Sequence, residues 1–334
     1  MNIYDIAKMA GVSIATVSRV VNGSEKVSEK TKQHVLKIID DAGYTPNVFA
    51  RSLGLNTMHT IGILVPDISD PYMSQAVYHL EERLSRYEYN CILACSGFSD
   101  ESKKSHVQML ISKHIDALIL VGSTYSGASI NTHTTDYIRE AASEVPIFII
   151  NGIVDGANIY CTVCNDKKAS YDLTTSLIKR GKKRILFLTD SHSYSACQKK
   201  SGYEEALSDA GLPVLGDLKL DTKNDIHYVR DQLLQYSTLK FDSAIATDDE
   251  IAVGVLKYAA VKGLSVPKDL SIIGYNNSSL SICCEPELTS VDNRVEQVCF
   301  DTIDRMISVL KGNADVPPHS EIECELVKRN TTDF

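Results

Sequence analysis

The chain has 334 residues, of which 43% are hydrophobic and 23% charged, a composition typical of a globular protein with two or three domains. It holds no apolar run of about 18 residues. Its N-terminus, MNIYDIAKMAGV, lacks the basic and apolar regions of a secretory signal, so we expect a cytosolic protein without a membrane span. The net charge of −9 is uneven, with +2 on residues 1–58 and −11 on the remainder, which confines any nucleic-acid contact to the N-terminal part.

The nine cysteines are an odd number without an export signal, so reduced thiols are expected. Cys161 and Cys164 form a CxxC pair with no second pair at zinc spacing, which disfavours a metal or redox site. Cys91, Cys95 and Cys299 have apolar neighbours in the sequence and are expected in the core. The sequence thus predicts no metal and no cofactor.

The first elements along the chain are two short helices joined by a tight turn, over residues 3–22 (IYDIAKMAGVSIATVSRVVN). Ser13 is a suitable N-cap for the second helix. This helix is apolar on its inner face, at Val17, Val20 and Val21, and small, polar or basic on its outer face. A helix-turn-helix needs this arrangement to enter the major groove of DNA, although an ordinary helical hairpin shows the same bare pattern.

A third helix follows, capped by Ser28, with Val35 on its apolar face and its end at Gly43. Residues 47–53 (NVFARSL) can form about two more helical turns, which are too few to be stable alone in water. Residues 54–60 then form a linker. The N-terminal part is therefore predicted to be a small all-α domain followed by a marginal helix.

From residue 61 apolar strands alternate with helices, in two successive sets. Such strands indicate parallel sheets covered on both faces, so we predict an α/β core of two doubly wound parallel-sheet lobes. A cleft should lie where the carboxyl ends of their strands face each other. No GxGxxG or GxxxxGK[ST] motif follows a strand, which disfavours a nucleotide site. The predicted strands are 61–67, 91–96, 117–122 and 146–151 in the first set and 162–165, 184–190, near 218, 243–247 and 270–275 in the second.

Several motifs together resemble the LacI/GalR family of transcriptional regulators, over essentially the whole chain. They include DIAxxAGVSxxTVSRVxNG and GYTPNxxARSL near the N-terminus, and VPDISDPYMSQ, AIATDDEIAVGVL and GLSVPKDLSIIGYNN in the core. The resemblance implies a helix-turn-helix head, a hinge helix that folds on the operator, and a periplasmic-binding-protein-like effector core. In that fold the chain crosses between the lobes three times, and we place the crossings near residues 152–158, 290–293 and 319–323.

The domains would then have the following bounds: 1–45 for the helix-turn-helix, 46–59 for the hinge helix and linker, 60–157 with 292–320 for the first lobe, and 158–291 with 321–334 for the second.

The resemblance also implies which residues contact DNA. Leu53 would wedge between central base steps in the minor groove. Arg19 can bond bidentately to a guanine, whereas Ile14 and Ala15 would contact thymine methyls or follow groove shape. Ser13, Thr16 and Asn22 would hold phosphates, although each of them alone could be a solvated surface residue. The matching positions are Ile3, Tyr4, Ser13, Ile14, Ala15, Thr16, Ser18, Arg19, Asn22, Asn47, Ala50 and Leu53.

The family's effector-binding positions match Tyr72, Met73, Asn151, Lys199, Asp248 and Asn276. An aromatic face such as that of Tyr72 can stack on a sugar or base ring, but a role in helix packing fits equally. The last four positions depart from the family pattern. Asn151 and Asn276 stand where aspartates are frequent. Lys199 stands where an arginine is frequent, and Asp248 where an asparagine is frequent. These departures suit a different polyol, a phosphorylated effector or a protein co-regulator.

The sequence therefore predicts a repressor of carbohydrate-utilisation genes. It would bind a double-stranded, pseudo-palindromic operator as a homodimer and be controlled by a small effector, a sugar or sugar derivative, in the cleft. The alternative is a cytosolic solute-binding or sensor protein whose effector is not a sugar, or one that answers to a protein co-regulator. An enzyme is disfavoured because no nucleophile elbow or paired-carboxylate motif surrounds His192, Cys197 or His227. No heptad tail follows, so a coiled-coil tetramer is not expected.

Overall fold

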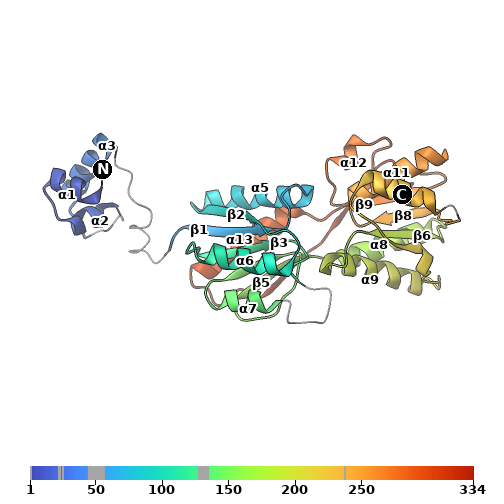
Figure 1. Ribbon diagram of the computed structural model, residues 1–334, viewed down its shortest axis with the longest axis horizontal. Coiled ribbons are helices and arrows are strands. Elements are labelled where there is room, and N and C mark those ends of the chain that lie inside the picture. The colour runs from blue at the N-terminus through green and yellow to red at the C-terminus, as the bar shows by residue number, and fades with distance from the viewer. Residues whose placement is uncertain (1, 22–23, 25, 44–56, 127–134, 237) are drawn as a thin grey trace.

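The protein consists of a helical head and two α/β lobes (Figure 1). The computed structural model describes residues 2–21, 24, 26–43, 57–126, 135–236 and 238–334. Within these residues no helix is long and apolar enough to cross a membrane. The fold matches the predicted class, an all-α domain followed by two parallel-sheet lobes.

The head is built from three helices, α1 (Ile3–Ala10), α2 (Ile14–Val21) and α3 (Glu29–Asp41). A capping box starts α1, because the Asn2 side chain accepts from the Asp5 N–H while the Asp5 carboxylate accepts from the Asn2 N–H. Gly11 ends α1 in the left-handed region, with φ of 62°. Ile6, Val17 and Val35 are fully buried where the three helices meet. The helix predicted at 47–53 lies outside the described residues.

The first lobe is a six-stranded parallel sheet in the order β11-β5-β4-β3-β1-β2. Ile61 and Ile63 on β1 pack under α5 and α13, whereas Leu64 packs under α6 and α7, so both faces are buried. This is why the strand is almost continuously apolar. The elements are β1 (Thr60–Val65), α5 (Pro71–Arg86), β2 (Asn90–Cys95), α6 (Asp100–Ile111), β3 (Ala117–Val121), α7 (Asp136–Ala142), β4 (Ile147–Ile150), β5 (Ile159–Cys164), α13 (Val295–Leu310) and β11 (His319–Ile322).

The second lobe has the strand order β12-β10-β9-β8-β6-β7, in which β12 is antiparallel to β10. Helices α8 and α9 cover one face around Leu173, Leu177 and Tyr203, and α10 and α11 cover the other. The elements are α8 (Asp166–Lys179), β6 (Ile185–Thr189), α9 (Tyr194–Asp209), the 3-10 helix η2 (Gly216–Leu218), β7 (Lys219–Asp221), α10 (Ile226–Gln235), β8 (Ser243–Ala246), α11 (Asp249–Lys262), β9 (Ser271–Tyr275), α12 (Leu280–Cys283), β10 (Thr289–Asp292) and β12 (Glu325–Val327).

The first crossing between the lobes differs from the prediction. The strand predicted at 162–165 is the end of β5, which pairs with β4 in the first sheet, so the chain crosses at Asn165 and not at 152–158. Assigning this strand to the second lobe was wrong. Its apolar side chains show that it is buried on both faces, but they do not show which sheet it joins.

The other two crossings lie close to their predicted positions. The second is at residues 293–294, between β10 and α13, and the third at residues 323–324, between β11 and β12. Residues 321–322 belong to β11 and therefore to the first sheet, although the predicted bounds gave them to the second lobe.

The cysteines are free thiols. Cys299 is buried, as predicted, and Cys91 is half-buried. Cys95 is exposed, so its predicted place in the core is wrong. The reason is that β2 lies at the edge of its sheet, where the neighbouring strand on one side is missing.

Candidate functional site

The outer face of α2 carries three of the side chains that were predicted to contact DNA. Ile14, Ala15 and Arg19 are exposed, and Tyr4 on α1 is 66% exposed. Ser13 caps α2, since its Oγ accepts from the Thr16 N–H at 3.2 Å. Ile3, Thr16 and Ser18 are half-buried, whereas Asn22, Asn47, Ala50 and Leu53 lie outside the described residues.

A cavity of about 360 Å³ lies between the two lobes. The first lobe contributes the segments that follow β1, β3 and β4, and the second contributes those that follow β6, β8 and β9 together with the start of α9. All six predicted effector-binding residues line it: Tyr72, Met73, Asn151, Lys199, Asp248 and Asn276. The carboxyl ends of parallel strands thus meet across a cleft, as the fold class predicts.

On the first-lobe wall, two of the predicted residues bind each other. The Asn151 side chain donates to the Tyr72 hydroxyl at 2.6 Å, and its own Oδ1 is buried without a hydrogen-bond partner. Burial raises the pKa of Tyr72 well above its usual range, so its hydroxyl stays protonated. Asp70 caps α5 by accepting from the Met73 N–H at 3.0 Å.

Asn151 and Asn276 both have a left-handed backbone, with φ of 60° and 88°. Each directly follows a strand at the cleft, β4 or β9. Asparagine is among the residues that tolerate this conformation best. The backbone therefore gives a physical reason for asparagine at both positions, apart from any ligand.

On the second-lobe wall, Lys199 is held by protein groups. Its Nζ donates to the Thr247 carbonyl at 3.1 Å and lies 3.7 Å from the centre of the Tyr275 ring. Burial raises the pKa of Asp166, and the nearby Lys199 opposes that shift. Lys199 thus holds α9 against the ends of β8 and β9, and its charge is already partly matched.

A chain of amides runs from the same wall toward the second crossing. Asn293 Nδ2 donates to Asn276 Oδ1 at 2.9 Å, and Asn276 Nδ2 donates to Asp248 Oδ2 at 2.7 Å. Asp248 Oδ1 accepts from the Glu250 N–H and caps α11. Burial raises the pKa of Asp248 to about 7, with smaller contributions from Asp249 and Asp70.

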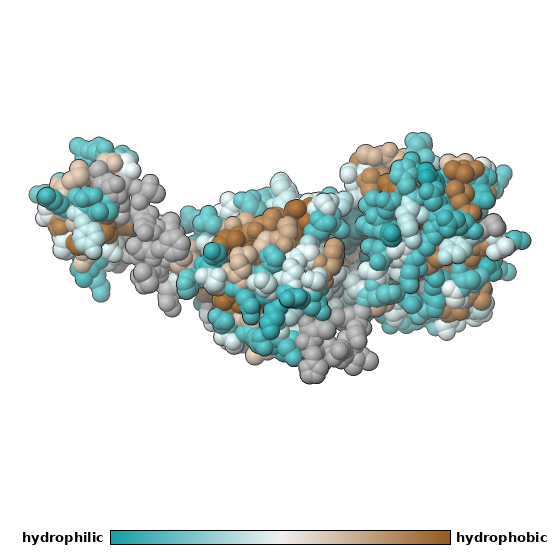
Figure 2. Space-filling model, in the orientation of Figure 1, coloured by the Kyte–Doolittle hydropathy of each residue, from teal (hydrophilic) through white to brown (hydrophobic). Residues whose placement is uncertain are grey.

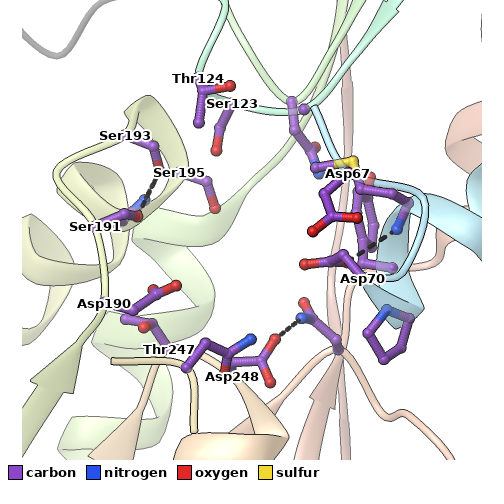
Figure 3. A pocket seen from close by; sticks show the side chains of 18 of the residues that line it. Asp67, Asp70, Ser123, Thr124, Asp190, Ser191, Ser193, Ser195, Thr247 and Asp248 are labelled. Atoms are coloured by element: carbon purple, nitrogen blue, oxygen red, sulfur yellow. Dashed lines mark hydrogen bonds between the residues drawn. The ribbon is translucent and has the colours of Figure 1, made fainter. Parts of the chain in front are cut away.

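Hydroxyls and carboxylates make up most of the remaining lining (Figure 3). Hydroxyls come from Ser123 and Thr124 on one lobe and from Ser191, Ser193 and Ser195 on the other. Lys199 is the one cation among the residues that line the cavity. Carboxylates also come from both lobes, namely Asp67, Asp70, Asp190, Asp248 and Glu250. Such a surface can form many hydrogen bonds to a polar, hydroxyl-rich molecule, with Tyr72 and Phe98 as apolar ring contacts.

Sequence reasoning missed several lining residues. Asp190 and Thr247 directly follow β6 and β8, so the rule that ligands bind at strand carboxyl ends could have identified them. Asp70 and Ser193 are N-caps of helices that begin at the cleft. Asn293 lies in the predicted second crossing, but nothing in the sequence indicated that its side chain lines the cavity.

The side chains considered for an enzyme do not form a catalytic pair. The Cys197 thiol donates to the backbone carbonyl of His192 at 3.6 Å, not to its ring. The His192 ring instead lies 3.7 Å from the Asp221 carboxylate, with both side chains largely exposed. A nucleophile needs a base within hydrogen-bond reach, and this geometry does not provide one.

Comparison with known proteins assigns both parts of the chain. Residues 2–47 match "Bacterial regulatory proteins, lacI family", and residues 174–332 match "Periplasmic binding protein-like domain". An HTH-type transcriptional regulator of Lachnoclostridium phytofermentans is 48% identical over 336 residues, which cover 100% of both chains. Catabolite control protein A of Priestia megaterium is 34% identical over 87% of each chain.

Solved structures agree in fold. A lac repressor dimer bound to operator and the anti-inducer ONPF has a TM-score of 0.88 at 24% identity, over 99% of each chain. A complex of the transcriptional regulator CelR with cellobiose has a TM-score of 0.72 at 23% identity, also over 99% of each chain. The chain therefore belongs to the lacI family of bacterial regulatory proteins, and it is a DNA-binding transcriptional regulator and not an enzyme.

Proposed function

We propose that this regulator is a repressor of carbohydrate-utilisation genes that binds a pseudo-palindromic operator as a homodimer. A small neutral or derivatised sugar in the cleft controls it. The observation that carries the proposal is the cavity of about 360 Å³, which both lobes line with hydroxyls, amides and carboxylates. A ligand held by both walls has a different affinity for the open and closed lobes, and only such a difference can shift the regulator between two states.

The relatives support a sugar as the class of effector. The solved neighbours include a CelR–cellobiose complex and a lacI-family regulator from Enterococcus faecium with bound ribose. In the present chain the carboxylates outnumber the single lysine in the lining. A doubly charged phosphate would meet net repulsion there, so free sugars are favoured over sugar phosphates.

Two apolar surfaces support a dimer. Figure 2 shows apolar surface over β2 beside α5 and over α11 with α12. Tyr78 and Leu93 are exposed on the first lobe, and Val261 and Ile282 on the second. A groove of about 420 Å³ on the second lobe is lined mainly by apolar side chains of α11 and the segment after α12. Exposed apolar surface of this kind marks association sites, and two-fold symmetry matches a palindrome.

The head would read the operator through α2. Arg19, Ile14 and Ala15 are exposed on it, which is the geometry that major-groove contact requires. Asn22, Asn47, Ala50 and Leu53 stay predicted contacts, with Leu53 as the minor-groove wedge.

The test is selection of bound sequences from random double-stranded DNA by the full chain at about 0.15 M salt, where non-specific phosphate contacts are weakened. We expect a palindrome with a C–G step at its centre. The bound fragment is then mixed with a panel of D-glucose, D-galactose, D-ribose, cellobiose and the 6-phosphates of the first two. Release by a free sugar supports the proposal. Failure to enrich any sequence contradicts the DNA role, and enrichment without release by any sugar contradicts the effector role and favours a protein co-regulator.

A further inference from the structure

Carboxylates of both lobes are directed into the one cavity (Figure 3). Asp70, the N-cap of α5, lies on the first-lobe wall, whereas Asp190, after β6, and Glu250, on α11, lie on the second-lobe wall. Burial raises the pKa of Asp70, and the charges of Asp190 and Asp67 add to the rise. Burial also raises the pKa of Glu250, and Asp70 and Asp190 are among the charges that add to it. Like charges of the two lobes therefore repel one another across the cleft.

The lysine in the lining does not offset these charges. Lys199 is 7% exposed, and its Nζ is already held by the Thr247 carbonyl and the Tyr275 ring. Its charge also acts on a carboxylate behind the wall, since burial raises the pKa of Asp166 and Lys199 opposes that rise. The carboxylates at the cavity surface thus keep a net negative charge that a ligand can neutralise.

A buried amide adds an acceptor that has no partner. Asn151 lines the cavity and is 8% exposed. Its Nδ2 donates to the Tyr72 hydroxyl, and its Oδ1 is buried without a hydrogen-bond partner. On the second lobe, Asn224 lines the cavity with an Oδ1 that also lacks a partner. Amide oxygens and carboxylates can only accept, so a ligand that satisfies this cavity must supply several donors.

We propose that the effector is an amino sugar, whose protonated amine lies among the carboxylates of the two lobes. An ammonium group supplies three donors and one positive charge, which match the acceptors and the negative charge of the walls. The hydroxyls of the sugar ring match the serine and threonine hydroxyls that line both walls. A neutral sugar would leave the repulsion between the carboxylates in place. The inference rests on the proposed function of the cleft and names the class of sugar that acts there.

Asp190 allows one of these charges to be removed without the loss of a helix cap. Asp70 caps α5 and Asp248 caps α11, whereas the helix that follows Asp190, α9, is capped by Ser193. Asp190→Asn keeps the shape of the side chain and removes one negative charge from the second-lobe wall. Asp315→Asn is the matched control, because it removes the same charge at an exposed position outside the cavity lining.

The experiment measures sugar affinity by calorimetry with the full chain at about pH 6.5, below the pKa of an α-amino group, so that the amines are charged. D-Glucosamine and D-galactosamine are compared with D-glucose and D-galactose and with the two N-acetyl derivatives, in which the same nitrogen is neutral. Fluorescence anisotropy with the selected operator fragment shows which of these sugars changes operator affinity. One amino sugar should change it and should bind at least about tenfold more tightly than its parent sugar and its N-acetyl derivative.

The variants test where the amine lies. Asp190→Asn should reduce the preference for the amino sugar over its parent sugar at least about threefold, whereas Asp315→Asn should leave that preference unchanged. Thermal unfolding checks each variant, and Glu250→Gln is measured in the same way if Asp190→Asn does not fold.

Three results would overturn the inference. If a parent sugar binds as tightly as its amino sugar and changes operator affinity, the inference fails and the proposed function stands. If putrescine, an amine without hydroxyls, binds as tightly as the amino sugars, charge alone is recognised and the assignment to an amino sugar fails. If none of the amino, parent or N-acetyl sugars changes operator affinity, and none of the earlier panel does, the inference and the proposed effector role both fail.

Discussion

Asp248 shows how one half-buried carboxylate can serve as a helix cap and as a titrating group. Its Oδ1 caps α11 and its Oδ2 accepts from Asn276. The charged groups that act on it are Asp249 on α11, Asp70 on α5 and Lys199 on α9. Burial is the largest effect and raises its pKa from 3.8 to about 7.

We expect this carboxylate to make stability depend on pH. Between pH 3.8 and about 7 the folded protein keeps a proton on Asp248 that the unfolded chain has lost. The contribution of Asp248 to the free energy of unfolding is therefore fully present below pH 3.8. It declines by up to about 4 kcal/mol as the pH rises to 7. Asp248→Asn should remove the decline, so urea unfolding should find the variant more stable relative to wild type at pH 8 than at pH 5.

The exposed Asp315 supplies the control for this prediction, since Asp315→Asn should change the stability equally at both pH values. Desolvation also raises the pKa values of the half-buried Asp70 and the buried Asp166, but the comparison of single variants isolates Asp248. An equal effect of Asp248→Asn at pH 5 and pH 8 would contradict the assignment.

Arg19 tests the DNA contact at the level of one side chain. Its loss should remove one bidentate bond to guanine, so Arg19→Ala should weaken operator binding by about 1–3 kcal/mol and relax the preference at one base pair of each half-site. Anisotropy titrations with operators changed at single positions measure both effects. Lys37→Ala on α3 removes an equal charge from an exposed position outside the predicted contacts. An equal, sequence-independent loss in both variants would show that Arg19 contacts only phosphate.

Helices α8 and α9 approach each other closely at Gly202, which makes the closest backbone contact among the described helical glycines. A Cβ on Gly202 would lie 2.0 Å from the Lys167 backbone carbonyl oxygen and 2.9 Å from the Tyr171 nitrogen. Backbone atoms of a packed helix cannot move aside as a flexible side chain can. Gly202 therefore sets how closely the two helices approach.

We expect Gly202→Ala to destabilise the protein by about 3 kcal/mol or more, because it forces two helices apart. Chemical unfolding followed by circular dichroism measures the loss. Gly216→Ala is the matched control, since a Cβ there meets nothing within 4 Å. A loss below about 0.5 kcal/mol for Gly202→Ala, as for an ordinary surface change, would contradict the packing argument.

The strength of the sequence signal differed between elements for a physical reason. Strands buried on both faces, such as β1, β3 and β6, are continuous apolar runs and were predicted. The short strands β10 (TSVD) and β11 (HSEI) carry polar side chains and gave no such run. On β10 the buried Ser290 hydroxyl donates to Asp249 at 2.6 Å, so a partner distant in sequence decides its burial.

The candidate site was predictable to the extent that it follows the fold. Three of the six predicted side chains, Asn151, Asp248 and Asn276, follow strand ends that meet at the cleft. The other three lie in the first halves of α5 and α9, the helices that follow β1 and β6. Their partners were not predictable. These partners lie far away in the sequence: Asn151 binds Tyr72, Lys199 binds the Thr247 carbonyl, and Asn293 binds Asn276.

For the molecule as a whole, the proposed dimer predicts the effect of a charge on the apolar surface. Ile282 on α12 is 57% exposed beside the apolar groove. Ile282→Asp should convert the dimer to monomers, because a carboxylate resists burial, and should weaken operator binding at least about tenfold. Sedimentation velocity and anisotropy measure the two effects. Val214→Asp makes a similar change at another exposed apolar residue, between α9 and η2, and should leave the dimer intact.

The three crossings also govern the order in which the chain can complete its parts during synthesis. Helix α13 and strand β11, which finish the first lobe, follow nearly all of the second lobe in the chain. Until they emerge, α5 lacks the helix that covers Leu80 and Leu84. The first lobe is thus completed late, and part of its apolar surface stays exposed during translation. A chain interrupted after residue 292 would therefore leave both lobes unfinished, and neither lobe can be produced alone by cutting the chain at one point.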